Sequence, residues 1–469
     1  MSDDDTYDPS KRNADSSVWS LVLLVFMLTA LWDQAISASA AEPERTAEVP
    51  ALPPCAGKGP AASEPARSRW PAAPLTEADI PAAVGDMTLA EKAAQMVQAD
   101  ISTATPEEVG KHGLGSIIST VPAGDLGATR NPELARRLAE VTARELAATG
   151  IRWTFAPSIA VARDIRWGRT YEALGEDVEL QQLFAAPMVE GYQGTDLTDP
   201  ASVGATAKHF IADGATEGGV DRGNAVISDE ELRRMHLPGF VDAIESGVVA
   251  VMASFSSVNG EAVHGSRALL TDLLKTELGF AGVVVTDWEG VELSGLTLEQ
   301  AFHAGIDMFM LVRSWRDGLP EIVRLVEDGK VRLSRIDDAV TRILRMKLRL
   351  GLFDSPLSSA ACAETMGAQA HRDIARQAVA ESLVPLRNEG GILPLDKDIK
   401  VIVAGSHADN VAYQSGGWTK KWQGAHDDRY GHAARPVDGA TSIIDGIRNL
   451  IGSDRVIDAG PSGIRSNAS

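Results

Sequence analysis

Cysteine is scarce in this chain of 469 residues, which contains only Cys55 and Cys362. Two cysteines can form at most one disulfide bond, and no Cys-x-x-Cys spacing exists. The sequence therefore excludes a disulfide scaffold and a zinc or redox site of that type, and we expect two free thiols. The nine histidines show no HExxH or HxH spacing. We expect no metal ion and no other cofactor.

Positive charge is also in short supply, because 65 acidic residues outnumber 44 basic ones and give a net charge of -21. Phosphate backbones and anionic lipid surfaces are bound by basic faces, so this balance disfavours nucleic acid and membrane surfaces as partners. The sequence contains neither a Walker A loop nor a GxSxG elbow. A neutral ligand such as a sugar is compatible with the charge.

The chain has few long apolar runs. The longest candidate for a membrane-spanning or targeting segment is Val18–Trp32, near the N-terminus. A membrane-spanning helix needs about 20 apolar residues. Lys11 and Arg12 precede this run, and Ala38–Ala40 follows it as an A-x-A cleavage pattern. We expect a signal peptide over residues 1–40 and a secreted or periplasmic protein. An uncleaved membrane anchor and a buried helix of a cytoplasmic protein are the alternatives.

Residues 41–78 are rich in alanine, proline and glutamate and are interpreted as a linker. From 79 to 353, short apolar segments alternate with helical ones, which predicts an α/β fold with a parallel sheet. The length matches a TIM-type (β/α) barrel. A doubly wound sheet is the alternative, although no glycine-rich phosphate turn opens a helix. The expected strands are Gly115–Ile118, Arg152–Ala156, Gly204–Phe210, Val248–Ser254, Gly282–Thr286 and Asp307–Leu311.

Three long helices are predicted in this barrel region, at Asn131–Thr149, Ser228–Ser246 and Leu333–Leu352. Thr88 and Glu91 form a capping-box pattern at the start of a further helix. Residues 354–370 form a second linker. Residues 371–469 then predict a partial α/β sandwich domain, with a helix over Ala370–Leu383 and a strand over Lys400–Gly405.

The most informative motif is a β-branched run, Val283–Val285, that ends at Asp287 and Trp288. The carboxyl ends of barrel strands carry catalytic residues. A carboxylate there, beside an aromatic ring, suits a glycosidase nucleophile with a platform for a sugar. The alternative is that Asp287 is the N-cap of the next helix.

Other polar residues also lie at expected strand ends. Arg169 suits sugar recognition because its guanidinium offers paired donors, or it forms a loop salt bridge. Lys208 and His209 follow a strand and can both turn into a site, although a lone histidine is more often structural. Trp418 and Trp422 offer faces for stacking on a pyranose, or they pack between domains.

These motifs together make the chain recognisable over roughly Ile80 to Ile451. It resembles glycoside hydrolase family 3, in the branch of β-glucosidases and exo-β-glucanases. That family folds as a (β/α)8 barrel followed by a six-stranded α/β sandwich and hydrolyses β-glucosides with retention of configuration. The matching segments are Arg163–Arg169, Ala207–Phe210, Met252–Phe255, Thr286–Gly290 and Ser415–Trp418.

The resemblance implies roles for individual residues. Asp287 matches the nucleophile, and Arg169, Lys208 and His209 match residues that hold the hydroxyls of the first glucose. Phe255 lies where the family often has an aromatic residue near the nucleophile. A last pair, Trp288 and Trp422, matches two indoles that clamp the next sugar. The expected ligand is a β-glucoside or β-glucan oligosaccharide, and the expected enzyme is β-glucosidase-like.

The chain also departs from the family pattern. After Ser116–Thr120, the strand that ends in Asp-Ala-Val-His-Gly, its helix and its glucose-binding aspartate are absent, so we expect a barrel lacking one strand–helix unit. No residue matches the glutamate of the second domain that acts as acid/base, and nothing in the sequence assigns that role to Glu172 or Glu289. The alternative function is therefore a catalytically impaired or non-catalytic sugar-binding relative.

Overall fold

The fold is that of a computed structural model, whose described residues all belong to the unit Leu52–Ser469. The structure describes residue 52 and residues 75–100, 103–118, 126–354, 365–418 and 440–460. The expected signal peptide, most of both linkers and both cysteines lie outside these residues. Among the described residues, no helix has both the length and the apolar character that crossing a membrane requires.

Parallel strands form the centre of the fold. One ladder has the order β2 (Ser116–Ile118), β1 (Val97–Asp100), β9 (Phe309–Met310), and the other has the order β3 (Thr206–Phe210), β5 (Ala250–Ala253), β8 (Val283–Val285). A bridge from Val285 to Met308 joins the two ladders. Bridges from Trp153 to Gly204 and from Ser158 to Lys208 add a further segment beside β3. This arrangement is of the predicted TIM-barrel type.

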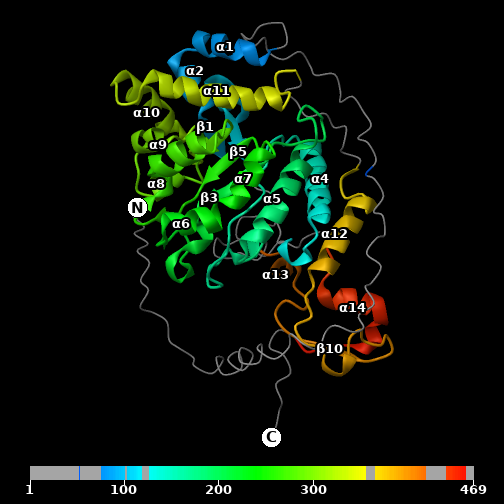
Figure 1. The fold of residues 1–469 in the computed structure, drawn as a ribbon. Coiled ribbons are helices and arrows are strands. Elements are labelled where there is room, and N and C mark those ends of the chain that lie inside the picture. The colour runs from blue at the N-terminus through cyan, green and yellow to red at the C-terminus, as the bar shows by residue number, and fades with distance from the viewer. Residues whose placement is uncertain are drawn as a thin grey trace, which may run out of the picture. The chain divides into compact units, whose positions relative to one another are not determined.

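Helices surround these strands (Figure 1). Residues of β1, β3, β5 and β8 are all buried, as expected when both faces of a parallel sheet are covered. The helices of this region are α1 (Ile80–Asp86), α2 (Leu89–Gln95), α3 (Pro106–His112), α4 (Pro132–Ala148), α5 (Val178–Gln193), α6 (Asp229–Glu231), α7 (Pro238–Glu245), α8 (Gly290–Leu293), α9 (Leu298–Ala304), α10 (Trp315–Glu327) and α11 (Leu333–Arg349). Three short strands, β4 (Asn224–Ala225), β6 (Ser257–Val258) and β7 (Glu261–Ala262), pair in a separate small sheet.

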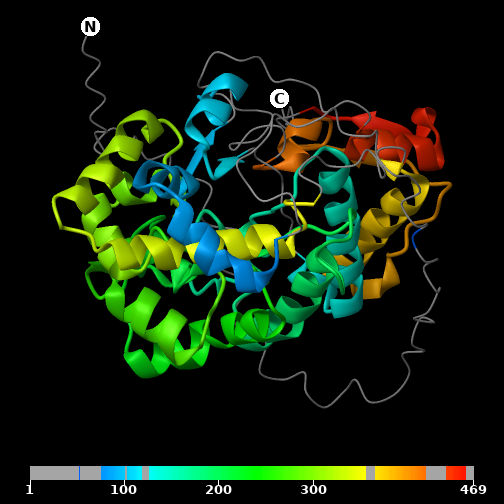
Figure 2. The ribbon, with the colours of Figure 1, turned by 90° about the horizontal axis from the view of Figure 1, so that it is seen from above.

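Most predicted helices are confirmed. The Thr88–Glu91 capping box starts α2, and the Asn131 side chain caps α4. The single helix predicted over Ser228–Ser246 is wrong, because α6 and α7 are separated by a π-helical turn, Leu232–His236. Pro238 starts α7 and has no N–H to donate to the preceding turn, which accounts for the break. Helices α1 and α11 lie side by side (Figure 2).

The strand β1 was not predicted, whereas the strand predicted over Arg152–Ala156 is wrong as a regular strand, because this segment and the residues just after it form only isolated bridges, at Trp153 and Ser158. The sequence of β1, Val-Gln-Ala-Asp, follows α2 almost directly and lacks the β-branched run that identified the other strands. Its Gln98 side chain donates to Ser116 Oγ on β2. The strand pairs with both β2 and β9 and thereby links the first and last parts of the barrel.

The barrel wall is irregular between β2 and the segment 153–158. Within the described residues, β2 pairs only with β1, and the segment pairs only with β3. The sequence predicts that a strand and a helix are missing after Thr120. That junction lies in residues 119–125, outside the described residues. A cavity of about 60 Å³ borders the segment 153–158 and is lined by Ala156–Ser158 and by residues of α4 and α5.

The C-terminal part contains the predicted helix and strand, as α12 (Gln369–Ser382) and β10 (Val401–Val403). Strand β10 pairs in parallel with β11 (Val456–Asp458), and α13 (Val411–Ser415) and α14 (Ile443–Ile451) complete the described elements. Helix α12 packs on α4, where His371 Nδ1 lies 2.8 Å from Glu145 Oε1. Helix α12 is thus attached to the barrel region by a specific side-chain contact.

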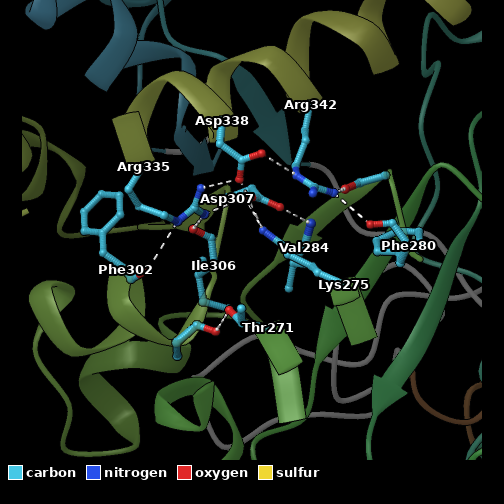
Figure 3. Close-up of polar contacts among 12 residues, drawn as sticks. Thr271, Lys275, Phe280, Val284, Phe302, Ile306, Asp307, Arg335, Asp338 and Arg342 are labelled. Atoms are coloured by element: carbon cyan, nitrogen blue, oxygen red, sulfur yellow. Dashed lines mark hydrogen bonds and ion pairs between the residues drawn. The ribbon is translucent and has the colours of Figure 1, made fainter. Parts of the chain in front are cut away.

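A buried carboxylate binds the middle of β8 (Figure 3). Asp307 is fully buried, and its Oδ2 accepts the backbone N–H of Val284 at 2.9 Å. Its Oδ1 lies 2.6 Å from both Lys275 Nζ and Arg335 Nη2. Burial alone raises the pKa of Asp307, but these two cations outweigh burial and hold the pKa below its ordinary value.

Candidate active site

Asp287 lies just beyond the carboxyl end of β8, with 16% of its side chain exposed. Its Oδ1 accepts the backbone N–H of Trp288 at 2.7 Å, and its Oδ2 lies 3.7 Å from His209 Nε2. The alternative role as a helix cap is wrong, because α8 begins at Gly290 and its N-cap position is held by Glu289. The carboxylate is therefore available to a ligand.

Lys208 and His209 both come from the end of β3 and both approach Asp287. The pairing of β3 with β5 shifts register between Ala207 and Phe210, which breaks the alternation that normally sends neighbouring side chains to opposite faces. Both side chains are buried. Burial lowers the pKa of Lys208, while its carboxylate neighbours, Asp287 among them, oppose that shift.

The tautomer of His209 follows from its partners. Arg169 Nη2 lies 2.9 Å from Nε2, and Asp213 Oδ2 lies 3.0 Å from Nδ1. A guanidinium only donates hydrogen bonds, so Nε2 accepts and the ring proton resides on Nδ1, facing the carboxylate of Asp213. The imidazole is thereby held in one orientation beside Asp287.

Arg169 and Glu172 form a buried ion pair beside this histidine. Two parallel hydrogen bonds of 2.9 and 2.7 Å join them. Burial opposes both charges, but the pair overcomes it. The pKa of Arg169 lies above its ordinary value, and the pKa of Glu172 is lowered to about 2. Both side chains are charged at neutral pH and fixed in position.

Asp213 is a buried support for the cluster that sequence reasoning did not select. Its Oδ1 accepts from Ser254 Oγ at 3.0 Å and from Ser256 Oγ at 2.9 Å. Burial raises the pKa of Asp213, but His209, Arg169 and the serine donors outweigh burial and hold it far below the usual range. Its position four residues after His209 was the available signal in the sequence.

The aromatic residues are distributed unevenly around Asp287. Trp288 follows it directly and is half-buried. Trp418 lies with its ring centroid 5.3 Å from Lys208 Nζ. Phe255 is nearly buried, with the Arg222 guanidinium 4.4 Å from its ring centroid. Trp422 lies outside the described residues.

Two further carboxylates close to the cluster in sequence have structural partners. Glu172 is bound to Arg169, as described above. Glu289 is buried and accepts the backbone N–H groups of Arg313 and Ser314 and the hydroxyl of Ser314. Both carboxylates are therefore held by hydrogen bonds to other groups of the protein. Within the described parts of the chain, no group of three His, Cys, Asp or Glu residues could hold a metal ion.

Comparison with known proteins gives consistent matches. The model of the glycosyl hydrolase family 3 N-terminal domain matches residues 121–346. A lysosomal beta glucosidase of Dictyostelium discoideum is 36% identical over 347 residues, which cover 69% of this chain and 41% of that protein. The chain spans only about two fifths of the curated relatives that head the matches.

Two solved structures show the same similarity. An exo-1,3/1,4-beta-glucanase from a Pseudoalteromonas species, in a mutant form, is 36% identical with a TM-score of 0.76, over 83% of this chain and 73% of the other. A beta-glucosidase from Listeria innocua in complex with glucose is 27% identical with a TM-score of 0.71, over 82% of this chain and 60% of the other.

Proposed function

Because this chain belongs to glycosyl hydrolase family 3, we propose that it is a glycosidase acting on β-glucosides or β-glucans from the non-reducing end. It releases glucose with retention of configuration, and Asp287 is the nucleophile. The support from its relatives is that they are β-glucosidases and an exo-β-glucanase, one of them in complex with glucose.

One observation carries this proposal. The carboxylate of Asp287 faces His209 at 3.7 Å at the carboxyl end of a barrel strand, in a cluster with Lys208 and Arg169. A retaining enzyme needs a carboxylate close to C1 of the sugar and donors that hold the hydroxyls. Lysine, arginine and histidine provide such donors, and a neutral sugar adds no charge to the buried cluster.

The reaction proceeds in two displacements. Asp287 attacks C1, the C1–oxygen bond to the aglycone breaks, and a glycosyl ester forms. Water then attacks C1 and releases glucose and the free carboxylate. Protonation of the leaving oxygen contributes ~10²–10⁴-fold in such reactions. The proposal assigns this proton transfer to neither Glu172 nor Glu289, since both are held by other bonds.

Aromatic rings complete the proposed sugar site. Trp288 adjoins the nucleophile and offers an indole face beyond the first glucose, and Trp422 is proposed as its partner. A mutant of the Listeria innocua enzyme is in complex with laminaribiose, which is consistent with a site for two glucose units in that relative. We propose the same ligand class here.

The test is hydrolysis of 2,4-dinitrophenyl β-glucoside by the full chain, with and without azide. This leaving group needs no proton, so turnover depends on the nucleophile. We expect turnover, and azide to produce glucosyl azide if proton transfer limits the natural reaction. The control is Asp287→Asn, which should lose turnover but still bind glucose. Retained turnover in the variant, or none in the folded wild type, would refute the proposal.

A further inference from the structure

His264 lies outside the proposed ligand-binding set and makes a direct contact with the nucleophile segment. It lies in a short 3-10 turn, Val263–Gly265, that follows the hairpin of β6 and β7. The turn is anchored by a hydrogen bond from Val263 N–H to Ser256 O. The side chain of His264 is fully buried. A side chain held in one position in this way can fix the position of the groups that it contacts.

The imidazole binds the backbone of Asp287 itself. The N–H of Asp287 donates to Nε2 of His264 at 3.1 Å. An acceptor nitrogen carries no proton, so the ring is neutral with its proton on Nδ1. Among the described residues Nδ1 has no hydrogen-bond partner, which leaves the Asp287 amide as the polar contact that fixes the ring. Burial favours the neutral form and lowers the pKa of His264 to about 4.

The ring also fits closely against the turn that follows Asp287. Gly290 N–H donates to Asp287 O at 2.9 Å and closes this turn. A Cβ on Gly290 would lie only 2.4 Å from Nε2 and 2.8 Å from Cε1 of His264, so only glycine allows the approach. On another side, Phe255 meets the ring edge-on, with 5.7 Å between centroids. The imidazole is therefore enclosed between the nucleophile turn and an aromatic side chain.

We infer that His264 is a positioning residue, whose neutral imidazole holds the Asp287 amide and so sets the direction of the nucleophilic carboxylate. This inference rests on the proposed function of Asp287. Backbone position controls the carboxylate because Oδ1 is bound to the next amide, at Trp288, and Oδ2 is left to face the ligand. A displacement of about 1 Å at a reacting group can reduce a rate ~10²-fold.

The test separates the hydrogen bond from the chemistry. Nitrogen-15 NMR of the full chain labelled at histidine reports the tautomer without any reaction. We expect His264 to have an unprotonated Nε2 at neutral pH, and we expect the same signal in Asp287→Asn, where the backbone amide remains. A protonated Nε2 overturns the inference whether or not the protein is an enzyme.

The chemical arm uses 2-deoxy-2-fluoro-β-glucosyl fluoride, which traps the nucleophile as an ester while the C1–F bond breaks and fluoride leaves. The variants His264→Gln and His264→Asn form a matched pair, since the Gln amide reaches the position of Nε2 and the Asn amide reaches only that of Nδ1. We expect trapping to slow ~10²-fold in His264→Asn and to recover largely in His264→Gln. Glucose affinity should change less than twofold in both.

The outcomes distinguish the two proposals. Equal trapping in both variants and the wild type overturns the positioning role, as does a parallel loss in both variants accompanied by weaker glucose binding. A folded wild type with the expected tautomer and no trapping refutes the proposed function and retains the hydrogen bond. If His264→Asn fails to fold, Gly290→Ala displaces the ring from the other side and should slow trapping in the same way.

Discussion

Arg169 donates a hydrogen bond to each carboxylate oxygen of Glu172, from Nε to Oε1 at 2.9 Å and from Nη2 to Oε2 at 2.7 Å. Paired bonds of this kind fix the plane of the guanidinium relative to the carboxylate. Nη2 also reaches His209 Nε2, so the orientation of two proposed sugar-binding residues depends on Glu172. Glu172 is therefore expected to orient its neighbours and not to transfer protons.

Replacement of Glu172 by Gln tests this role. If Glu172 only orients Arg169, kcat/KM should fall by a similar factor, about tenfold or more, for 2,4-dinitrophenyl and 4-nitrophenyl β-glucosides, because geometry matters equally to both. An acid would behave differently, since its loss affects poor leaving groups most. Parallel kinetics on the two substrates decide the question. A loss confined to the 4-nitrophenyl substrate would make Glu172 the acid.

The same ion pair predicts a dependence of stability on pH. The folded pKa of Glu172, about 2, lies below its ordinary value of 4.5. The folded protein thus resists protonation, and the stabilisation is complete above pH 4.5 and is lost as pH falls toward 2. Each pH unit in this window removes about 1.4 kcal/mol. The advantage of wild type over Glu172→Gln, measured by urea unfolding, should shrink between pH 6 and pH 3.5. An unchanged difference would contradict this account.

The sequence predicted the central features of the site because they follow from local patterns. Asp287 is detected by the β-branched run before it, and Lys208 and His209 by the strand that they end. Asp213 and His264 were missed. Asp213 lies four residues after His209, but the serines that it binds and the segment that His264 binds are distant in the chain. Asp213 meets Ser254 across 41 positions, and His264 meets Asp287 across 23. Such contacts are determined by the packing of the barrel, which no local pattern encodes.

The role of Glu289 also depends on tertiary contacts that the sequence does not reveal. It lies two residues after Asp287, but nothing in the sequence assigned it the role of acid/base. The structure turns it away, because its backbone adopts a left-handed conformation with φ of 48° and its carboxylate binds the amides before α10. The direction of the Glu289 carboxylate depends on where residues 313 and 314 lie, which is a property of the tertiary fold.

Export is a separate prediction. We propose that the segment 1–40 is removed after Ala40, since an apolar run preceded by Lys11 and Arg12 is followed by Ala38–Ala40. Expression of the full chain in a Gram-negative host should yield periplasmic protein that begins at Ala41, as measured by intact mass. The control is Ala40→Glu, which should block cleavage and leave the longer form. A cytoplasmic protein of full mass would contradict the proposal.

Strand β8 provides the final prediction, through Asp307. Asp307→Asn removes the buried counter-charge nearest to Lys275 and Arg335, and losing one partner of a buried pair costs about 3–5 kcal/mol. Asp338→Asn is the matched control. Asp338 contacts the same Arg335 but is 46% exposed, so its loss should cost about 1 kcal/mol or less. Urea unfolding of the two variants measures the difference.

Because Asp307 binds Val284 within the strand and not the Asp287 segment beyond its carboxyl end, glucose affinity of the folded Asp307→Asn protein should stay at the wild-type value. Equal stability of the two variants would show that the network in Figure 3 does not anchor the strand that carries the proposed nucleophile.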